Sequence, residues 1–293
     1  MTEASLKFNY LNANHCQCST INAVASANEN NIDILLMTEP YYPTYTNRVY
    51  APGWDMVCGP RSAILVRRDL EHTPQISQHN DVVMTQVGET LIICAYSSPN
   101  EDNTEILLYL HDAIASTPKP VILAGDFNCT TSFIPGYTTN ARGLEFETLI
   151  TQAVLTIQNN TQPTWRRGDQ YSINDYVCTR GREVTLFRVH LDDSHSDHFL
   201  ISFTALTEAT KREPLFRTDP TKLSAAVRNL VIATPKLNCR NDVEGFLTNL
   251  TVNLQECIMN ASDKITSRHS KLPWWTPHLT ALKSALRRLS RQI

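Results

Sequence analysis

Residues 121–130 read VILAGDFNCT. The apolar run at 121–124 predicts a buried strand, because a short apolar stretch that ends at Gly and Asp suits a strand better than a helix. Asp126 and Asn128 follow shortly after the run, in the stretch Gly125-Asp126-Phe127-Asn128. One interpretation of this pair is a plain turn after a buried strand. The other is a site, since sheet-based enzymes present polar side chains to a ligand where their strands end.

Nine further runs in the first 207 residues are also rich in Val, Ile, Leu, Tyr and Phe. They cover residues 6–11, 32–38, 55–59, 63–67, 82–87, 91–96, 176–179, 184–191 and 199–206. Helical patterns interrupt these runs at 19–28, 104–115 and 144–153. Many strands with a few helices predict an α+β fold, a four-layer α/β sandwich of two packed β-sheets flanked by helices.

The pattern changes from Pro214 onward. Asp219-Pro220 predicts the start of a helix that runs to residue 231, and Asn241 predicts the start of a longer one. A third helix is predicted to begin at Thr276-Pro277. We therefore expect two parts, a sandwich domain in residues 1–207 and a basic helical tail in residues 208–293.

The formal net charge of −3 hides a difference between these parts. Residues 208–293 hold 14 Lys and Arg against 7 Asp and Glu, whereas residues 1–207 are acidic. A basic segment of this kind can hold a polyanion through counterion release. On charge alone, two solvated surfaces of opposite sign are the plainer interpretation.

The composition excludes several classes of protein. With 42% hydrophobic and 19% charged residues, the chain is neither disordered nor collagen-like. No apolar run approaches the roughly 20 residues that span a bilayer, and the first residues lack the basic and apolar regions of a secretory signal. Eight Cys residues without a CxxC pair are predicted to be free thiols in a reducing, intracellular compartment.

Polar side chains recur at the ends of the other predicted strands. Several carboxylates in one pocket cannot all be ionised without a cation, and hard oxygen ligands favour Mg²⁺ or Mn²⁺. Amide, Tyr and His donors beside them suit a phosphate, so the pattern predicts hydrolysis. Taken singly, each residue also fits a structural role. The residues concerned are Asn12, Glu39, Tyr96, Asp126, Asp175, Asp197 and His198.

Six short motifs contain these residues. They are Leu11-Asn12, Thr38-Glu39-Pro40, Ala95-Tyr96, Gly125-Asp126-Phe127-Asn128, Ser172-Ile173-Asn174-Asp175 and Ser196-Asp197-His198. Each motif alone is a weak signal, but six in this order are a strong one. Over residues 5–204 the chain resembles the endonuclease/exonuclease/phosphatase superfamily, whose motifs occur in the same order.

Within that superfamily, the chain is most similar to the apurinic-type endonuclease domain of non-LTR retrotransposon polyproteins. The helix ARGLEFETLI at 141–150 and the closing strand SDHFLISF at 196–203 carry this likeness. The segment LPWWTPHLTALKSALRRLSR at 272–291 resembles the linker that precedes the reverse transcriptase in those polyproteins. A full-length protein of this kind is expected to carry a reverse transcriptase domain downstream; a degenerate or domesticated remnant is the other possibility.

The resemblance implies a metal site and a set of catalytic residues. Glu39, with help from Asn12, holds a divalent metal, and Asp197 assists; Asn14 is a rival for the place of Asn12. The resemblance also assigns catalytic roles to five residues. Asp126 orients or deprotonates the attacking water, Asn128 binds the scissile phosphate, Asp175 orients His198, His198 donates a hydrogen bond or proton, and Tyr96 stabilises the pentacovalent phosphorane.

Residues 164–172 read TWRRGDQYS and predict a hairpin with its turn at Gly168-Asp169. In the nucleases that the chain resembles, this hairpin reaches the DNA near the cut. Arg166 and Arg167 would then pair with phosphates, and Trp165 or Tyr171 would stack or wedge between bases. A core role is as good an interpretation of Trp165. The implied DNA-contacting residues are Thr164, Trp165, Arg166, Arg167, Tyr171, Ser172 and Ser196.

The leading hypothesis is a Mg²⁺- or Mn²⁺-dependent endonuclease that nicks one strand of double-stranded DNA and leaves a 3′-hydroxyl to prime reverse transcription. The tail would bind element RNA, and the DNA substrate implies a nuclear location. A second hypothesis keeps the chemistry and changes the substrate, as in an abasic-site repair nuclease, a deadenylase or a phosphatase. A third is an inactive remnant that only binds nucleic acid or a partner.

Overall fold

The computed structural model describes residues 4–43, 46, 48–191, 194–207, 216–229 and 240–264. These residues form two compact units, one within 4–207 and one within 216–264. No helix in the described ranges combines the length and hydropathy needed to cross a bilayer.

The first unit contains two six-stranded sheets. The strands of the first sheet are β1 (Ala4–Asn12), β2 (Ile34–Thr38), β3 (Trp54–Cys58), β4 (Ser62–Arg67), β13 (Val184–His190) and β14 (Leu200–Thr207). They lie in the order β13-β14-β1-β2-β4-β3. Only β1 and β2 run parallel to each other, and β14 pairs antiparallel with β1.

The second sheet repeats this plan. Its strands are β5 (Thr73–Gln75), β6 (Val82–Val87), β7 (Thr90–Tyr96), β8 (Val121–Asp126), β9 (Thr156–Ile157) and β12 (Asp175–Arg180). Their order is β5-β6-β7-β8-β12-β9. Here β7 and β8 are parallel, and β12 pairs antiparallel with β8 so that Asp175 lies opposite Asp126.

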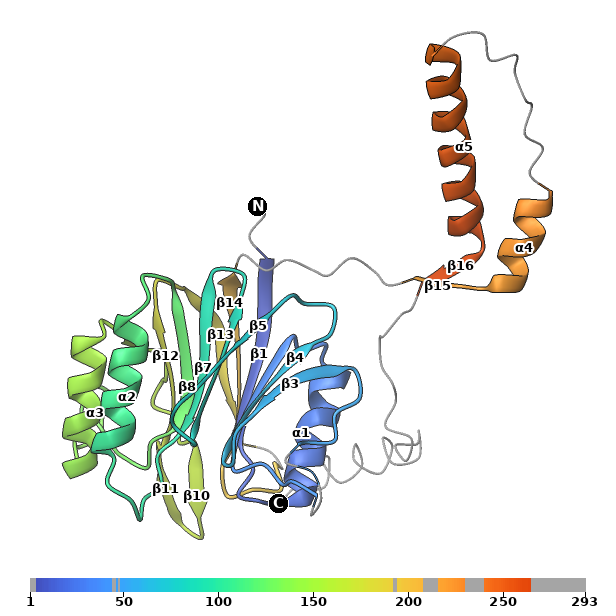
Figure 1. The fold of residues 1–293 in the computed structure, drawn as a ribbon. Helices are drawn as coiled ribbons and strands as arrows, with labels where there is room; N and C mark the ends of the chain where they lie inside the picture. The colour runs from blue at the N-terminus through green and yellow to red at the C-terminus, as the bar shows by residue number, and fades with distance from the viewer. Residues whose placement is uncertain are drawn as a thin grey trace. The chain divides into compact units, whose positions relative to one another are not determined.

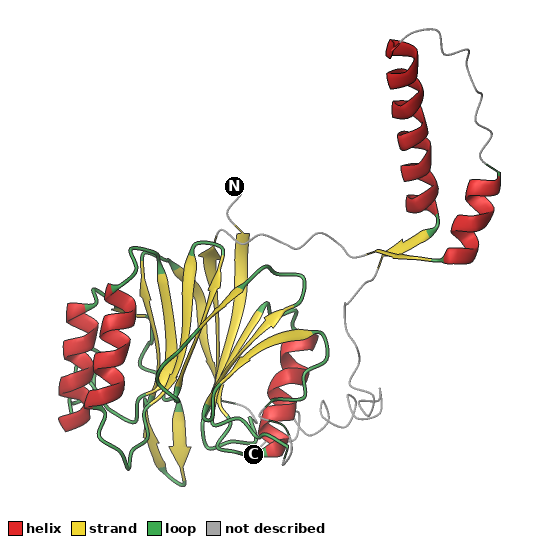
Figure 2. Cartoon of the chain, viewed as in Figure 1, coloured by secondary structure: helices red, strands yellow, loops and turns green. Residues whose placement is uncertain are grey.

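Three helices complete the four layers (Figure 1). They are α1 (Gln17–Glu29), α2 (Thr104–Ala115) and α3 (Ala141–Gln152). One apolar cluster fills the space between the two sheets, a second lies between the second sheet and α2 and α3, and a third lies between the first sheet and α1. In Figure 2 the three red helices of the first unit stand on the outer sides of the two layers of yellow strands.

The direction of the central strands gathers the predicted site at one edge. Each sheet has a parallel pair whose carboxyl ends finish in Asn12 and Thr38, or in Tyr96 and Asp126. Gly125 allows β7 and β8 to lie close together at this edge, because a Cβ there would stand 2.2 Å from the carbonyl oxygen of Ala95.

The first unit also carries a hairpin formed by β10 (Trp165–Arg167) and β11 (Gln170–Ser172). Its turn contains Gly168 with φ of 62°, a backbone conformation that glycine adopts without a steric cost. The hairpin is thus found where the sequence predicts it.

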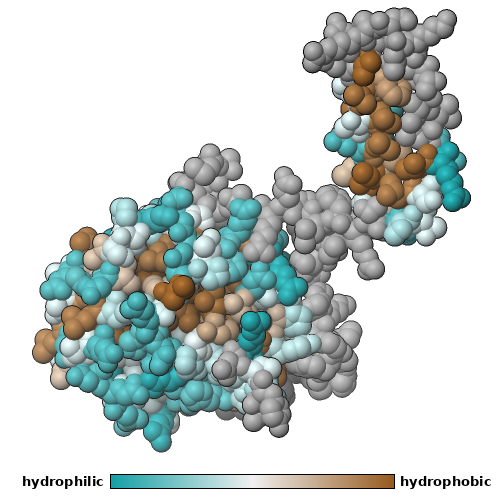
Figure 3. Space-filling view, viewed as in Figure 1, coloured by the Kyte–Doolittle hydropathy of each residue, from teal (hydrophilic) through white to brown (hydrophobic). Residues whose placement is uncertain are grey.

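The second unit consists of β15 (Phe216–Thr218), α4 (Pro220–Arg228), α5 (Arg240–Asn260) and β16 (Ser262–Lys264). Asp219 caps α4, with Oδ1 accepting from the backbone N of Thr221 at 2.8 Å. Exposed apolar side chains lie along α5, among them Leu247 and Ile258 (Figure 3). The third helix predicted for the tail lies outside the described residues.

The α+β sandwich predicted from the sequence is confirmed, with all ten strands and all three helices of the first 207 residues present. The short strands β5 and β9 and the β15–β16 pair were not predicted. They are two or three residues long, so they carry no apolar run of their own.

A chain shortened to residues 1–207 should fold by itself, because every strand of the two sheets and all three flanking helices lie within it. Thermal unfolding followed by circular dichroism should show one cooperative transition for the shortened chain. A shortened chain that is soluble only with residues 208–293 attached would contradict the division at residue 207.

Candidate active site

Asn12 joins the ends of the two sheets. Its side-chain Nδ2 donates to Asp126 Oδ2 at 2.8 Å and lies 3.2 Å from Glu39 Oε2. Asn12 Oδ1 accepts from the backbone N of Asn14 at 2.8 Å. Asn12 is fully buried, so its amide holds two carboxylates of different sheets at one point.

Glu39 stands in a strained backbone conformation directly after β2, with φ of 45°. Two backbone hydrogen bonds hold it, from its own N to Arg61 O at 2.7 Å and from His15 N to its O at 2.8 Å. The His15 Nε2 also lies 3.4 Å from Glu39 Oε1. Strained residues of this kind gather at functional sites, where the surrounding structure maintains them.

Asp126, Asp175 and His198 form a buried group. His198 Nδ1 lies 2.7 Å from Asp175 Oδ2, and His198 Nε2 lies 3.9 Å from Asp126 Oδ2. Asp175 Oδ1 accepts from the hydroxyl of Tyr10 at 2.9 Å, and the backbone N of Asp175 donates to Thr164 Oγ1 at 3.0 Å. Asp175 is therefore fixed from several sides and holds the imidazole in one orientation.

Burial and the neighbouring charges act in opposite directions on the pKa values of this group. Burial, together with the charge of Asp175, raises the pKa of Asp126 to about 7, although His198 works in the opposite direction. Burial alone would lower the pKa of His198, but the charge and hydrogen bond of Asp175 outweigh it and raise that pKa to about 9. The imidazolium of His198 thus compensates the two buried carboxylates.

Tyr96 ends β7, beside the Glu39 carboxylate. Burial and this carboxylate raise the pKa of Tyr96 well above its usual value, so its hydroxyl keeps its proton and serves as a donor. The guanidinium of Arg61 lies over the ring, 5.1 Å from its centroid, and is itself held by Asp81 at 2.6 Å.

Asn128 follows β8 in the left-handed region with φ of 47°. Its backbone N donates to Asp126 Oδ1 at 3.0 Å, and its Nδ2 donates to the Ser97 carbonyl at 3.1 Å. The loop after β8 therefore places Asn128 beside Asp126, as the spacing of the two residues predicts.

Asp197 is engaged on both carboxylate oxygens. Asn14 Nδ2 donates to Oδ1 at 3.0 Å, and Trp165 Nε1 donates to Oδ2 at 3.0 Å. Ser196 Oγ donates to the carbonyl of Asn12 at 2.8 Å, which ties this loop to the end of β1. Asn12, not Asn14, contacts Glu39 and Asp126, whereas Asn14 contacts Asp197.

The hairpin divides into an anchored base and an exposed tip. Thr164 is buried, and the backbone N of Phe199 donates to its carbonyl at 2.7 Å. The backbone of Trp165 forms an isolated antiparallel β-bridge with that of His198. Ser172 pairs with Trp165 at the base. The side chains of Arg166, Arg167 and Tyr171 are exposed, with the Arg166 guanidinium 5.6 Å from the Tyr171 ring centroid.

Three residues of this site are not singled out from the sequence: Tyr10, Arg61 and His15. Thr38 enters the sequence analysis only as part of the Thr38-Glu39-Pro40 motif. Tyr10 is buried and its hydroxyl bridges Thr38 Oγ1 at 2.8 Å and Asp175. A Tyr inside a strand of alternating apolar and polar residues has the pattern of a core residue, so the sequence does not reveal the hydrogen bonds of its hydroxyl. His15 stands next to the first motif, and this position is the one available signal.

The site contains side-chain atoms of the kinds that bind divalent metals. Ligand atoms of Asp126, Asp175 and His198 all lie within 4.8 Å of one another, so this group could hold a metal ion. Glu39 offers a hard carboxylate close by, and its side chain is 16% exposed. Solvent therefore reaches the Glu39 side chain directly. The amide oxygen of Asn12 accepts from the backbone N of Asn14.

Residues 90–202 match the model of a family described as endonuclease-reverse transcriptase. The resemblance predicted from the six motifs is confirmed. The endonuclease domain of TRAS1, a telomere-specific non-LTR retrotransposon, has a similar structure, with a TM-score of 0.61 and 20% sequence identity over 69% of this chain and 98% of that chain. At this identity the likeness shows a shared fold. None of the curated proteins matches the sequence.

Replacing Asp175 by Asn should lower the pKa of His198, because it removes the charge that raises this pKa and leaves burial, which lowers it. The charge of Asp175 also makes the protonated form of His198 stabilise the metal-free fold. This contribution is fully present below about pH 6.5 and is lost as the pH rises through about 9. NMR titration of His198 in EDTA measures the shift. An unchanged His198 pKa in Asp175→Asn would contradict the proposed coupling, and Asp112→Asn, at an exposed carboxylate on α2, is the matched control.

Proposed function

We propose that this protein is a metal-dependent DNA endonuclease that nicks one strand of its target and leaves a 3′-hydroxyl to prime reverse transcription. The observation that supports it most is the buried group of Asn12, Asp126, Asp175 and His198 at the common edge of two sheets. A fold shared with a retrotransposon endonuclease domain adds to this support.

Asp126 is suited to accept the proton of the attacking water. Its pKa of about 7 lies near neutral pH, where a general base is most efficient, and hydrogen bonds from Asn12 and Asn128 orient its carboxylate. The proton then passes to a carboxylate whose neutral form burial already favours.

His198 and Tyr96 are suited to act on the phosphate. His198 carries a proton at neutral pH and is oriented through Nδ1 by Asp175, so Nε2–H can donate to a phosphate oxygen or to the leaving 3′-oxygen. The hydroxyl of Tyr96 and the amide of Asn128 supply further donors to the pentacovalent phosphorane. Donors fixed before reaction are the most effective way to stabilise developing charge.

We assign Mg²⁺ or Mn²⁺ to Glu39 and Asn12, with Asp197 near by, because their oxygens suit hard cations. A divalent ion held there supplies positive charge against the charge that develops on the phosphate. Within the group of Asp126, Asp175 and His198, the imidazole already forms a 2.7 Å hydrogen bond with Asp175, which fits proton transfer better than metal coordination.

Double-stranded DNA is the proposed substrate, with the hairpin from Thr164 to Ser172 as the element that meets it. Arg166 and Arg167 at the exposed tip can pair with phosphates or enter a narrow minor groove, and Tyr171 offers a stacking face. Trp165 is bound to Asp197, so it anchors the hairpin to the site. The basic tail at 208–293 is proposed to hold element RNA, and a DNA substrate implies a nuclear location.

Asp126→Asn and His198→Asn should each slow nicking of supercoiled plasmid in Mg²⁺ by roughly 100- to 10,000-fold, the usual contribution of a general acid or base. The measurement is conversion of supercoiled to nicked circles, with EDTA as the metal-free control. Asp112→Asn changes an exposed carboxylate on α2 and should leave the rate unchanged. A near wild-type rate in either site variant would refute the assignment. Faster cutting of an abasic-site duplex than of intact plasmid would favour the repair hypothesis instead.

Glu39→Gln tests the metal assignment. Its nicking rate should recover as the Mg²⁺ concentration is raised, with the midpoint of the titration at least tenfold higher than in the wild type, because an amide is a weaker ligand than a carboxylate. A midpoint that stays where the wild-type protein has it would remove Glu39 from the metal site.

Replacing Arg166 and Arg167 together by Ala should change where the DNA is cut, because the residues that contact the scissile phosphate carry no sequence information. Nick positions mapped on one plasmid should become more evenly distributed, with activity restored at low salt. Arg68→Ala together with Arg48→Ala removes two charges elsewhere on the same unit and serves as the control. The same cut-site pattern in the hairpin variant and the wild type would place target choice outside this hairpin.

A further inference from the structure

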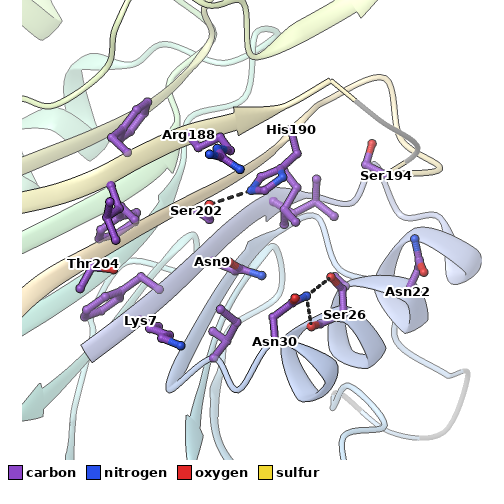
Figure 4. A pocket seen from close by; sticks show the side chains of 18 residues that line it. Lys7, Asn9, Asn22, Ser26, Asn30, Arg188, His190, Ser194, Ser202 and Thr204 are labelled. Carbon is purple, nitrogen blue, oxygen red and sulfur yellow. Dashed lines mark hydrogen bonds between the residues drawn. The ribbon is translucent and has the colours of Figure 1, made fainter. Parts of the chain in front are cut away.

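A groove lies on the outer face of the first sheet, beside α1 and apart from the active site (Figure 4). It has a volume of about 710 Å³, in the range of small-molecule sites. Strand β1 and strand β14 form its floor, α1 forms one wall, and β13 forms the other. Neither the carboxylates of the active site nor the hairpin tip lines this groove.

Asn9 on the floor carries an unsatisfied polar atom. Its side chain is 2% exposed, and its Oδ1 has no hydrogen-bond partner in the described part of the chain. A buried amide oxygen left without a partner is unfavourable, so a ligand that donates to it would offset this cost. Figure 4 shows Asn9 between Ser202 of β14 and Asn30 at the end of α1.

The wall formed by α1 is also lined by hydrogen-bonding groups. Asn22, Ser26 and Asn30 follow one another at intervals of four residues, so they form one row along the helix. Asn30 Nδ2 donates to the Ser26 carbonyl at 2.8 Å, which fixes the amide at the end of the row. The groove therefore offers both donors and acceptors.

A bulge in β13 shapes the opposite wall. The pairing of β13 with β14 shifts between Thr185 and Arg188, and Leu186 within the bulge has φ of 54°. Leu186 is consequently 80% exposed at the rim of the groove, although it is a large apolar side chain. Bulges of this kind redirect side chains beside binding sites.

The charged side chains that line the groove are cationic. Lys7 and Arg188 are exposed at its rim, and His190 Nε2 lies 2.7 Å from Ser202 Oγ. Among the described residues that line the groove there is no Asp or Glu. An anionic ligand would therefore meet attraction here, in a unit whose sequence is acidic as a whole.

We propose that this groove binds one or two nucleotides of a single-stranded nucleic acid, apart from the active site. A base has apolar faces and an edge of donors and acceptors, which Leu186 and the amides of Asn9 and Asn22 can meet. The phosphates require cations, which Lys7 and Arg188 provide. The floor from Lys7 to Leu11 extends over roughly 13 Å of strand, enough for more than one nucleotide.

The test is binding of a fluorescein-labelled ten-nucleotide oligo(dT) in EDTA, where cleavage has no part, so the result is independent of the proposed nuclease activity. Arg188→Glu should weaken binding by at least fivefold at low salt. Arg68→Glu makes the same charge change at an exposed Arg beyond β4 and should have less than a twofold effect. Circular dichroism melting verifies that both variants fold.

Two-dimensional NMR of the ¹⁵N-labelled full chain locates the bound strand. The oligonucleotide should shift the side-chain amide resonances of Asn9 and Asn22, and inorganic phosphate alone should leave them in place. Equal losses in Arg188→Glu and Arg68→Glu, or unmoved Asn9 and Asn22 resonances, would overturn the proposal. Shifts produced by dTMP but not by the oligonucleotide would also overturn it, since the ligand would then be a free nucleotide.

Discussion

The hydrogen bond from Asn12 Nδ2 to Asp126 Oδ2, 2.8 Å long, joins the end of β1 in one sheet to the end of β8 in the other. The bond from Tyr10 to Asp175 joins the same two sheets one step deeper. Both bonds exist only if the sheets pack with their parallel strand pairs ending at one edge. The positions of the other site residues follow from that packing. Glu39 follows β2 and Tyr96 ends β7, and these strands lie beside β1 and β8.

Two buried carboxylates at this edge would be unfavourable without compensation. His198 supplies it, since its imidazolium lies 2.7 Å from Asp175 and 3.9 Å from Asp126. The same arrangement leaves Asp126 with a pKa of about 7 and His198 with one of about 9. The arrangement that compensates the buried charges therefore also provides a base in Asp126 and an acid in His198.

The sequence predicts the sandwich because its strands are apolar runs that end in polar residues. It predicts where Asn12, Asp126 and His198 lie along the chain, since each follows or precedes such a run. It does not reveal Tyr10, because a buried Tyr in a strand has the pattern of a core residue whether or not its hydroxyl bonds Asp175. Nor does it decide between Asn12 and Asn14, whose contacts depend on the turn after β1. The groove beside α1 stays hidden because its residues come from strands and a helix far apart in the sequence.

Cleavage of plasmid in H₂¹⁸O, with mass spectrometry of the ends at the nick, tests the central claim most directly. Attack of water on phosphorus with departure of the 3′-oxygen places one ¹⁸O in the 5′-phosphate and leaves an unlabelled 3′-hydroxyl. We predict this result in Mg²⁺, and its loss in EDTA. Labelled 3′-phosphate, or a 5′-hydroxyl at the nick, would show that the group of Asp126, Asp175 and His198 does not perform the hydrolysis derived from its geometry.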